Sequence, residues 1–391
     1  MRILHVVPSY APAWRFGGPI RAVHGLAKAQ VESGDRVEVF TTDAGLEGEP
    51  PTRSARVREL DGVRVTYFPR AFPRAVYRAA GLKSSARKRI REFDLVHLHS
   101  VFLWPTLVSA RVAERVNVPY LISPRGMLVE ELIRMRGRWR KEIWIRCFER
   151  RTLRSSAAIV ATSEVEATEL RRLGLDTAPI KVVPNGIEVG ATEEATQPAP
   201  AELVERAIAK GSYVLYLGRL SRKKNLDLLV AAVAGTPDLR LLVAGSDEHG
   251  ERDRIERLVA QAGLEGRVEF LGEIVGAAKE RLLGKCMALV LVSVSENFGN
   301  VVVEALAAGR PVVVTPTVGS AEIVRSARAG HVVEHDVVEI AAALRALAEA
   351  PEEATRSGQR GREYVARELS WRRVAERMNE VYSSAIGPKA V

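Results

Sequence analysis

The sequence predicts an α/β protein of two domains, each a parallel β-sheet with helices on both faces. Three observations predict it. The chain of 391 residues is long enough for two hydrophobic cores. In both halves, apolar runs of strand length alternate with helical stretches, as in parallel sheets. Residues 190–201 interrupt this alternation with loop-forming residues. We therefore expect domains at residues 1–188 and 202–370, a linker at 189–201 and a final helical segment at 371–391.

The composition is that of a globular protein that does not cross a membrane. Apolar residues make up 47% of the chain, and its longest apolar runs are far shorter than the ~20 residues of a membrane span. The first residues lead directly into a strand pattern and do not have the layout of a signal peptide. Cys147 and Cys286 lie in opposite halves, which suggests neither a disulfide framework nor a cysteine-based metal site. A cytoplasmic location is therefore expected.

The net charge of +10 is concentrated in the first half. Residues 1–190 contain 32 Lys and Arg against 20 Asp and Glu, whereas residues 191–391 contain 26 against 28. This asymmetry indicates an anionic partner: a phosphorylated acceptor, a membrane surface or nucleic acid. Because the sequence contains no known nucleic-acid-binding module, nucleic acid is the weakest of these partners. Alternatively, these arginines lie on solvated helix surfaces and bind no specific partner.

The chain begins with a strand, a glycine loop, a helix and a second strand. Residues 3–7 form the first predicted strand, Gly17 and Gly18 precede a helix that ends near residue 32, and residues 36–41 form the next strand. The loop does not match G-x-G-x-x-G, so a dinucleotide site is not supported. The glycine pair either lets the backbone approach a ligand closely or forms an ordinary turn.

Polar residues follow two further strands of the first half. His97 and His99 share one face of a strand at residues 94–99, and His99 lies at its carboxyl end. With no third ligand nearby in the sequence, a metal site is not expected there. A strand at 118–123 leads into a tight Ser-Pro-Arg-Gly loop that would present Arg125 at the same edge of the sheet.

Two basic stretches, at residues 70–93 and 134–154, are expected to be helical. The second combines many arginines with Trp139, Trp144 and Phe148. This combination suits an anionic membrane surface or an anionic acceptor. A partly buried helix with a solvated face fits the same spacing, so both interpretations remain open.

The second half repeats the strand–helix alternation and carries two candidate ligand loops. Strands are expected at 213–217, 239–244, 268–271, 288–292 and 311–314. The loop after the first of them contains Gly218, Arg219 and Lys224, which could bind a diphosphate or form a solvated basic loop. The loop after 288–292 contains Glu296, and Glu304 lies in the helix that follows. Because this loop should lie at the carboxyl edge of the sheet, it is either a ligand site or a corner with solvated acids.

The chain resembles the GT-B glycosyltransferases of family 4, the retaining "group 1" transferases. The resemblance covers nearly the whole chain and depends on Gly17-Gly18, on Gly218-Arg219 with Lys224, on Glu296-x7-Glu304, and on the helix at 371–382. The segment 118–186 is similar to transferases of exopolysaccharide, capsule or lipopolysaccharide assembly. The resemblance implies two Rossmann-like domains facing a cleft, with the C-terminal helix packing back on the N-terminal domain.

The resemblance also implies a metal-independent transfer of a hexose from a nucleotide diphosphate sugar to a glycan acceptor, which would be lipid-linked. No cofactor would be needed beyond this co-substrate, and the protein could be peripheral on the inner face of the plasma membrane. The implied catalytic residues are Arg219, Lys224, Glu296 and His99. The implied donor-binding residues are Gly17, Gly18, Gly218, Asn297, Phe298, Gly299, Asn300 and Glu304.

The sequence departs from the family pattern in one loop. Many relatives carry a His in the loop after the strand that corresponds to residues 119–123, where this chain reads Ser-Pro-Arg-Gly. Either His99 or Arg125 could therefore take the cleft role, Arg125 by contacting a phosphate or the acceptor. Two other functions remain open: a nucleotide-sugar epimerase on the same architecture, and a sensor that binds a sugar nucleotide without transferring the sugar.

Overall fold

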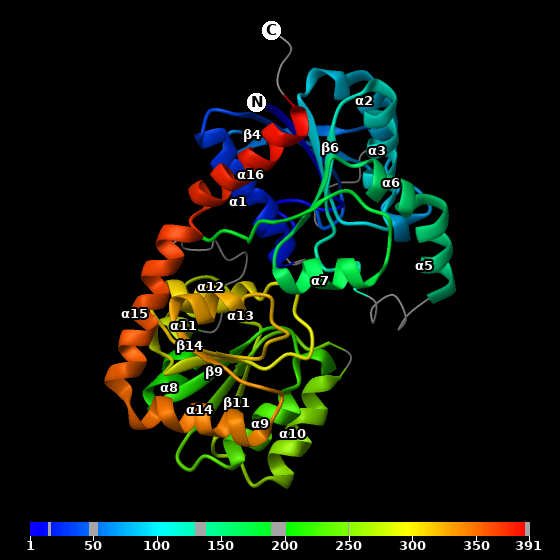
Figure 1. Ribbon diagram of the computed structural model, residues 1–391. Coiled ribbons are helices and arrows are strands. Elements are labelled where there is room, and N and C mark those ends of the chain that lie inside the picture. Colours follow the sequence, from blue (N-terminus) through cyan, green and yellow to red (C-terminus); the bar gives the residue numbers. More distant parts are fainter. Residues whose placement is uncertain (15–16, 47–53, 130–137, 189–200, 249, 388–391) are drawn as a thin grey trace. The chain divides into compact units, whose positions relative to one another are not determined.

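The computed structural model describes the chain except for residues 15–16, 47–53, 130–137, 189–200, 249 and 388–391 (Figure 1). The chain divides into two compact units. The first contains residues 1–186 and 371–391, and the second contains residues 187–370. All but the last residue of the expected linker at 189–201 lies outside the described residues. Each unit has its own parallel sheet and its own buried core, which confirms the predicted fold class.

The first unit is built on an eight-stranded sheet of order β3-β4-β2-β1-β5-β6-β7-β8. Neighbouring strands are parallel except at the β3–β4 edge, which is antiparallel and was not expected from the sequence. The strand order reverses between β1 and β5, so the carboxyl edge of the sheet has a topological switch point between these two strands. The strands are β1 (Arg2–Val6), β2 (Arg36–Thr42), β3 (Arg56–Leu60), β4 (Val63–Phe68), β5 (Leu95–His99), β6 (Tyr120–Ser123), β7 (Ala158–Ala161) and β8 (Ile180–Val182).

Helices cover both faces of this sheet because its strands are apolar on both sides. Leu4 and Val6 belong to the core beneath α2, α3, α6 and α7, whereas Ile3 belongs to the core beneath α1 and α16. The helices are α1 (Gly18–Glu32), α2 (Leu82–Arg89), α3 (Trp104–Val116), α5 (Arg138–Trp144), α6 (Arg150–Ser155), α7 (Glu164–Arg172) and α16 (Trp371–Ile386).

The two basic stretches are less continuous than predicted. Residues 70–93 contain only one α-helix, α2, flanked by 3₁₀ turns at Arg74–Val76 and Ile90–Glu92. Tyr77 and Gly81 lie in the left-handed region, which ends the first turn and delays the helix. In the second stretch, a π-helical segment (Ile145–Glu149) separates α5 from α6.

The C-terminal helix α16 packs on the first sheet, as expected. Trp371 lies against Gly25 of α1 and against Gly186, since a Cβ atom on either glycine would come within 2.2–2.5 Å of the indole ring. Further along the helix, Val374, Met378 and Tyr382 are buried in the same core. The red helix in Figure 1 follows this course beside α1.

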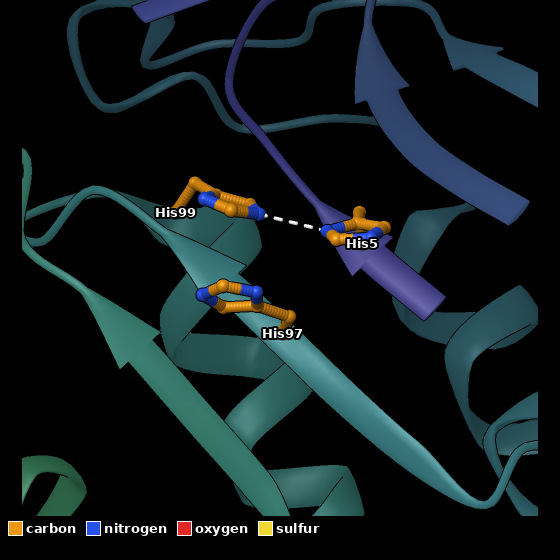
Figure 2. A group of neighbouring side chains, drawn as sticks. All are labelled: His5, His97 and His99. Atoms are coloured by element: carbon orange, nitrogen blue, oxygen red, sulfur yellow. Dashed lines mark hydrogen bonds between the residues drawn. The ribbon is translucent and has the colours of Figure 1, made fainter. Parts of the chain in front are cut away.

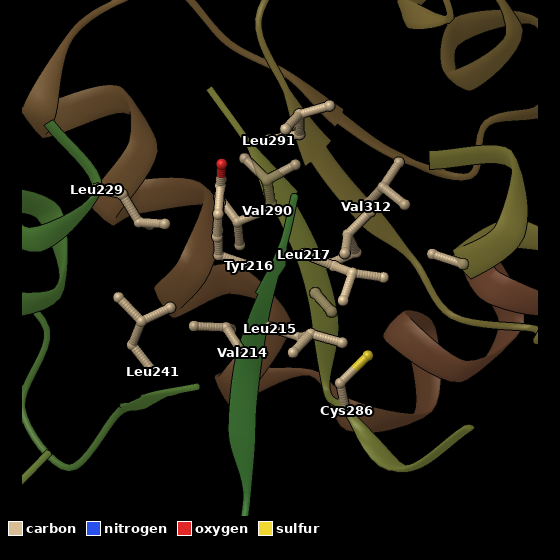
Figure 3. Close-up of a cluster of buried hydrophobic side chains, with 14 of the residues drawn as sticks. Val214, Leu215, Tyr216, Leu217, Leu229, Leu241, Cys286, Val290, Leu291 and Val312 are labelled. Carbon is tan, nitrogen blue, oxygen red and sulfur yellow. The ribbon is translucent and has the colours of Figure 1, made fainter. Parts of the chain in front are cut away.

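The second unit has a six-stranded parallel sheet of order β11-β10-β9-β12-β13-β14. Figure 3 shows its core, in which Leu215 of the central strand lies among aliphatic side chains. The strand order reverses between β9 and β12, so the loops after these two strands meet at the switch point. The strands are β9 (Tyr213–Leu217), β10 (Arg240–Ala244), β11 (Val268–Gly272), β12 (Ala288–Leu291), β13 (Val312–Val314) and β14 (Gly330–Val332).

Helices connect the strands of the second sheet, and a 3₁₀ turn (Arg222–Lys224) precedes α9. Within the described part of the chain, no helix combines the length and the apolar character needed to cross a bilayer. The helices are α8 (Ala201–Ala209), α9 (Leu226–Ala234), α10 (Glu251–Gln261), α11 (Gly276–Lys285), α12 (Asn300–Ala307), α13 (Ala321–Ala327), α14 (Val337–Glu349) and α15 (Pro351–Glu368).

Candidate active site

The loop between β12 and α12 holds Glu296 at the carboxyl edge of the second sheet. The backbone N–H of Glu296 donates to Thr317 O (3.1 Å), and the Gly319 N–H donates to Glu296 O (2.9 Å). These two bonds fix the loop against the one that follows β13. Glu304 lies inside α12, as predicted, and about a fifth of each glutamate side chain is exposed.

Gly299 sets the start of α12. It has φ +83°, and a Cβ atom there would lie 3.0 Å from Val318 Cγ1. Phe298 is buried beside it, and α12 begins at Asn300. The first backbone N–H groups of a helix lack intrahelical acceptors and favour an anion. Asn297 to Asn300 therefore lie where the sequence predicted an anion-binding turn.

The loop after β9 brings Lys224 to Glu296 but directs Arg219 elsewhere. Lys224 is only 9% exposed, and its Nζ forms an ion pair and hydrogen bond with Glu296 Oε2. Arg219 is exposed and contacts Glu248 (3.4 Å). Gly218 donates its N–H to Ala244 O (2.9 Å) and fixes the base of the loop. The two cations expected to act together thus lie on one loop with different partners.

Glu304 has a partner that the sequence did not reveal. Lys279, near the start of α11, places its Nζ 2.9 Å from Glu304 Oε2. Lys279 Nζ and Glu304 Oε2 are close enough for an ion pair, but Oε2 accepts no hydrogen bond. Both side chains are mostly buried. The sequence shows Lys279 in the helix that follows residues 272–275, but nothing in the sequence indicates that this lysine contacts α12.

Several polar atoms around these loops are buried without a hydrogen-bond partner. They are the hydroxyls of Ser221, Ser293 and Ser320, in addition to Glu304 Oε2. Ser221 precedes the Lys224 turn, Ser293 follows β12, and Ser320 donates its N–H to Phe298 O (2.8 Å). Buried polar groups normally have partners, and those that lack them often mark ligand sites. The loops at this switch point are therefore suited to receive a polar ligand.

A cavity of about 160 Å³ lies at the same edge of the second sheet, beyond β10. Its lining includes Gly272, the last residue of β11, and Glu273 after it. The guanidinium of Arg252 lies 5.6 Å from the Phe270 ring centroid in its wall. An aromatic face, a cation and a carboxylate side by side can accept a flat polar group such as a nucleobase.

The first unit contains the remaining predicted residues. Gly17 is the N-cap of α1, with φ +80°, and Gly18 begins the helix. His99 ends β5 and is buried, and Arg125 lies in the loop after β6. Arg125 donates from Nη1 to Asn185 Oδ1 (2.7 Å) and from Nη2 to His99 Nδ1 (3.3 Å). The structure therefore joins His99 and Arg125, which the sequence treated as alternatives.

The sequence showed no third potential metal ligand near His97 and His99, but the fold brings one to them. His5 lies beside them on β1, in register with His97, and Figure 2 shows the three imidazoles together. Strand alternation puts all three on the α1/α16 face of the sheet. His5 Nδ1 and His99 Nε2 are 2.9 Å apart. The sequence could not reveal this cluster because it did not show that β1 and β5 are neighbours.

The three histidines fit a hydrogen-bonded chain better than a metal ion. Coordination through His99 Nε2 would move the proton to Nδ1, where it would face the Nη2 donor of Arg125. His97 already uses both ring nitrogens, toward Tyr382 Oη (2.7 Å) and Ser123 Oγ (2.9 Å). The Arg125 charge would also repel a cation. We therefore assign no metal to this cluster.

Two family models match the chain. The model described as "Glycosyl transferases group 1" matches residues 203–364, and the model described as "Glycosyl transferase 4-like domain" matches residues 17–186. The chain is 27% identical to the GDP-mannose:cellobiosyl-diphosphopolyprenol alpha-mannosyltransferase of Xanthomonas campestris, over 99% of this chain and 98% of that protein. It is 28% identical to the D-inositol 3-phosphate glycosyltransferase of a Nocardioides species, over 98% and 88%.

Solved structures share the fold over nearly the whole chain. Anabaena Alr3699/HepE in complex with UDP matches with a TM-score of 0.75 and 21% identity, over 98% of this chain and 100% of that chain. The sucrose-phosphate synthase of Thermosynechococcus elongatus matches with a TM-score of 0.73 and 23% identity, over 97% and 98%. Together, the family models and the fold support the assignment of this chain to the GT-B glycosyltransferases. Its two matched segments are those of group 1 and 4-like transferases.

Proposed function

We propose that the protein transfers a sugar from a nucleotide diphosphate sugar to a lipid-linked glycan in surface polysaccharide biosynthesis, with retention of anomeric configuration. The observation that carries the proposal is the Lys224–Glu296 pair at the switch point of the second sheet, beside the N-terminus of α12. The Xanthomonas relative, whose name specifies a nucleotide-sugar donor and a diphosphopolyprenol acceptor, supports the substrate classes.

Each group of the donor has a candidate partner in the second unit. Lys224 and Arg219 would bind the diphosphate and stabilise the charge of the leaving group. Glu304 would accept hydrogen bonds from the ribose hydroxyls. Glu296, with the backbone N–H groups from Asn297 to Asn300, would orient the transferred sugar. Lys279 would hold Glu304 until the ribose arrives, because the two side chains already form an ion pair.

In this proposal the leaving phosphate itself removes the proton of the acceptor. The bond between the anomeric carbon and the phosphate oxygen breaks, and the acceptor oxygen forms the new bond on the same face. The acceptor proton moves to the phosphate, so no protein base is required. His99 is neutral, since burial lowers its pKa well below the usual value. His99 would act through Arg125, which it contacts through Nδ1 (3.3 Å), and the Gly17-Gly18 turn would admit donor phosphate or acceptor.

A donor panel tests the proposal. Purified protein is incubated with UDP-, GDP- and ADP-sugars and membrane extract, and the release of nucleoside diphosphate is measured. We expect release that depends on both one donor and the extract, and an NMR assignment of the product anomer tests retention. Conversion of donor without extract would instead indicate an epimerase, and binding without release a sensor. If the folded protein turns over no donor, the proposal is wrong.

Glu304→Ala tests the donor site, and Glu322→Ala provides its matched control. The variant removes the proposed ribose acceptor, so it should weaken binding of the nucleotide while its circular dichroism spectrum is unchanged. Glu322→Ala removes an exposed glutamate of α13 in the same unit. It should bind nucleotide like the unmodified protein. Equal affinity of all three proteins would refute the ribose role of Glu304.

We also propose that α5 contacts an anionic membrane surface. Trp139 and Ile143 lie one turn apart on this helix and are 62% and 53% exposed. Phe148, in the next turn, is 39% exposed, and Arg146 and Arg150 beside it are exposed as well. Apolar side chains next to cations match the interface of an anionic bilayer.

Co-sedimentation with vesicles tests this surface. The protein should bind phosphatidylglycerol-containing vesicles and should not bind pure phosphatidylcholine. Trp139→Ser with Ile143→Ser should reduce the bound fraction, whereas Val338→Ser, at an exposed apolar residue of α14 in the other unit, should not. Unchanged binding by the α5 variant would exclude this helix as the contact.

A further inference from the structure

Arg125 is held in an unusual backbone conformation at the carboxyl edge of the first sheet. It has φ +57°, and Gly126 after it has φ +75°. Residues other than glycine rarely adopt this conformation, and such strain is concentrated at functional sites. The turn places the guanidinium beside the end of β5, near the switch point between β1 and β5. Ligands of open α/β sheets bind at this kind of edge.

The guanidinium of Arg125 has neutral partners. Nη1 donates to the Asn185 amide oxygen, and Nη2 donates to the His99 imidazole. Nε is buried and has no acceptor. Among the residues that the structure describes, no carboxylate lies within ion-pair distance of Arg125. Because Arg stays protonated even where burial lowers its pKa, the cation retains its charge and several unused donors.

Glu166, the acidic residue that acts on the charge of Arg125, is held by other groups. Glu166 influences the pKa of Arg125 from a distance. Its Oε1 accepts the Gly126 N–H (2.7 Å), and its Oε2 accepts both the N–H and the hydroxyl of Thr162 (2.7 and 2.9 Å). Glu166 therefore fixes the turn through the backbone of the next residue and leaves the guanidinium of Arg125 open to another anion.

A chain of neutral side chains continues behind Arg125. Because His99 Nδ1 accepts from Arg125, the His99 proton lies on Nε2 and is donated to His5 Nδ1 (2.9 Å). The proton of His5 then lies on Nε2 and is donated to Gln30 Oε1 (2.9 Å). Burial lowers the pKa of His5 to about 4 and keeps His99 neutral. The chain orients the guanidinium without supplying a negative charge.

We propose that Arg125 binds an oxyanion of the substrate, a phosphoryl or carboxylate group, and that His99, His5 and Gln30 position it. A guanidinium presents paired N–H donors that match both kinds of oxyanion. The inference rests on the proposed transferase function, which can supply either group: the diphosphate of a lipid-linked acceptor or the carboxylate of an acidic sugar. The basic charge of the first half favours such a substrate.

The test measures binding of small oxyanions to the full chain by titration calorimetry. Lys224→Gln serves as the background, so that the diphosphate site of the second unit is weakened. Inorganic pyrophosphate represents the lipid diphosphate, methyl glucuronide represents an acidic sugar, and methyl glucoside is the neutral control. We expect saturable binding of at least one anionic probe, and Arg125→Gln should weaken it about tenfold or more, since this removes a charge-assisted hydrogen bond.

Matched variants separate this site from general charge effects. Arg74→Gln removes an exposed arginine of the same unit and should leave probe affinity unchanged. Arg125→Lys should restore part of the affinity. Stronger binding of pyrophosphate would identify a phosphoryl group, and stronger binding of the glucuronide a carboxylate. The proposal is overturned if neither probe binds, or if Arg125→Gln and Arg74→Gln have equal effects.

The positioning chain requires a separate measurement. His99→Phe removes the acceptor of Nη2, whereas His99→Gln retains an amide oxygen that can accept from Arg125. Probe affinity should fall in the first variant and recover in the second, measured at a temperature at which thermal unfolding shows both variants to be folded. Nucleoside diphosphate affinity, measured with Lys224 intact, should stay the same in both. If the unmodified protein does not bind a nucleoside diphosphate, the proposed function is contradicted. If it binds the nucleotide but neither oxyanion probe, only the oxyanion site is contradicted.

Discussion

Replacement of Lys224 by Gln tests the centre of the candidate donor site. Lys224 is 9% exposed, and its side chain forms an ion pair with Glu296, of which 20% is exposed. The substitution keeps a similar length and a hydrogen-bonding end but removes the charge. Glu296 would then carry an unpaired negative charge next to the position proposed for the diphosphate. Binding of a nucleoside diphosphate should therefore lose one attraction and gain one repulsion.

The expected magnitude follows from these contacts. A hydrogen bond to a charged group contributes about 1.5–3 kcal/mol, so the dissociation constant of the nucleoside diphosphate should rise about 10- to 150-fold. The free energy of unfolding should also fall, by about 1–3 kcal/mol, because both side chains are mostly buried and Glu296 would lose its partner. Titration calorimetry gives the first quantity and urea denaturation the second.

Two further variants make this prediction decisive. Arg222→Gln removes the same charge from the same loop, but Arg222 is 84% exposed and pairs with Glu251. Its effect on nucleotide affinity should be below about threefold. Lys224→Gln with Glu296→Gln completes a double-mutant cycle, in which the second substitution should recover part of the lost affinity. If Lys224→Gln binds nucleotide like the unmodified protein, the assignment of Lys224 to the diphosphate is refuted.

Three further predictions concern the second sheet edge and the histidine cluster. Lys279→Met should weaken nucleotide binding less than Glu304→Ala in calorimetry, because Lys279 contacts the glutamate and has no proposed donor contact; an equal loss would indicate direct binding. Gly299→Ala should lower the free energy of unfolding by about 1–3 kcal/mol, because its φ is +83°, whereas Gly284→Ala in α11, with open space around it, should not; equal unfolding midpoints in urea would contradict this. The pKa of His5 is about 4 when folded, below its unfolded value of about 6.5, so unfolded protein binds more protons between these values. The contribution of His5 should therefore be fully present above pH 6.5 and fall by up to about 3 kcal/mol as the pH drops to 4, in addition to the contributions of His97 and His99, whose pKa values burial also lowers. His5→Gln should reduce the slope in urea titrations; an unchanged slope would exclude His5 as a source.

The sequence predicted the elements whose local pattern is unambiguous. The strands around Leu215 and Val290 are short, apolar and buried, and they lie where the alternation indicated. The antiparallel strand β3 was missed because only Val57 and Leu60 of its five residues are apolar and this edge strand is partly exposed. The basic stretch at 70–93 was expected to be helical, but Tyr77 and Gly81 adopt left-handed conformations that interrupt it.

The candidate site was likewise predicted only in part. Glu296 and Lys224 were recognised because each lies in a loop after a buried strand, and parallel strands bring such loops to one edge. Their direct pairing depends on β9 and β12 being neighbours, and the sequence does not state that order. Lys279 and His5 were missed for the same reason: the partner of each lies on another helix or strand, which becomes its neighbour only in the fold.

The sequence by itself determined the α/β class, the strand and helix periodicity, the concentration of positive charge in the first half, and the loops that carry Lys224 and Glu296. These are local properties, set by the alternation of apolar residues and by glycine at turns. Only the tertiary structure decided which loops meet. It paired Lys279 with Glu304, and it placed His5 beside His99 and Arg125, because strand order in a parallel sheet is set by long crossover connections and by packing rather than by nearest-neighbour residues.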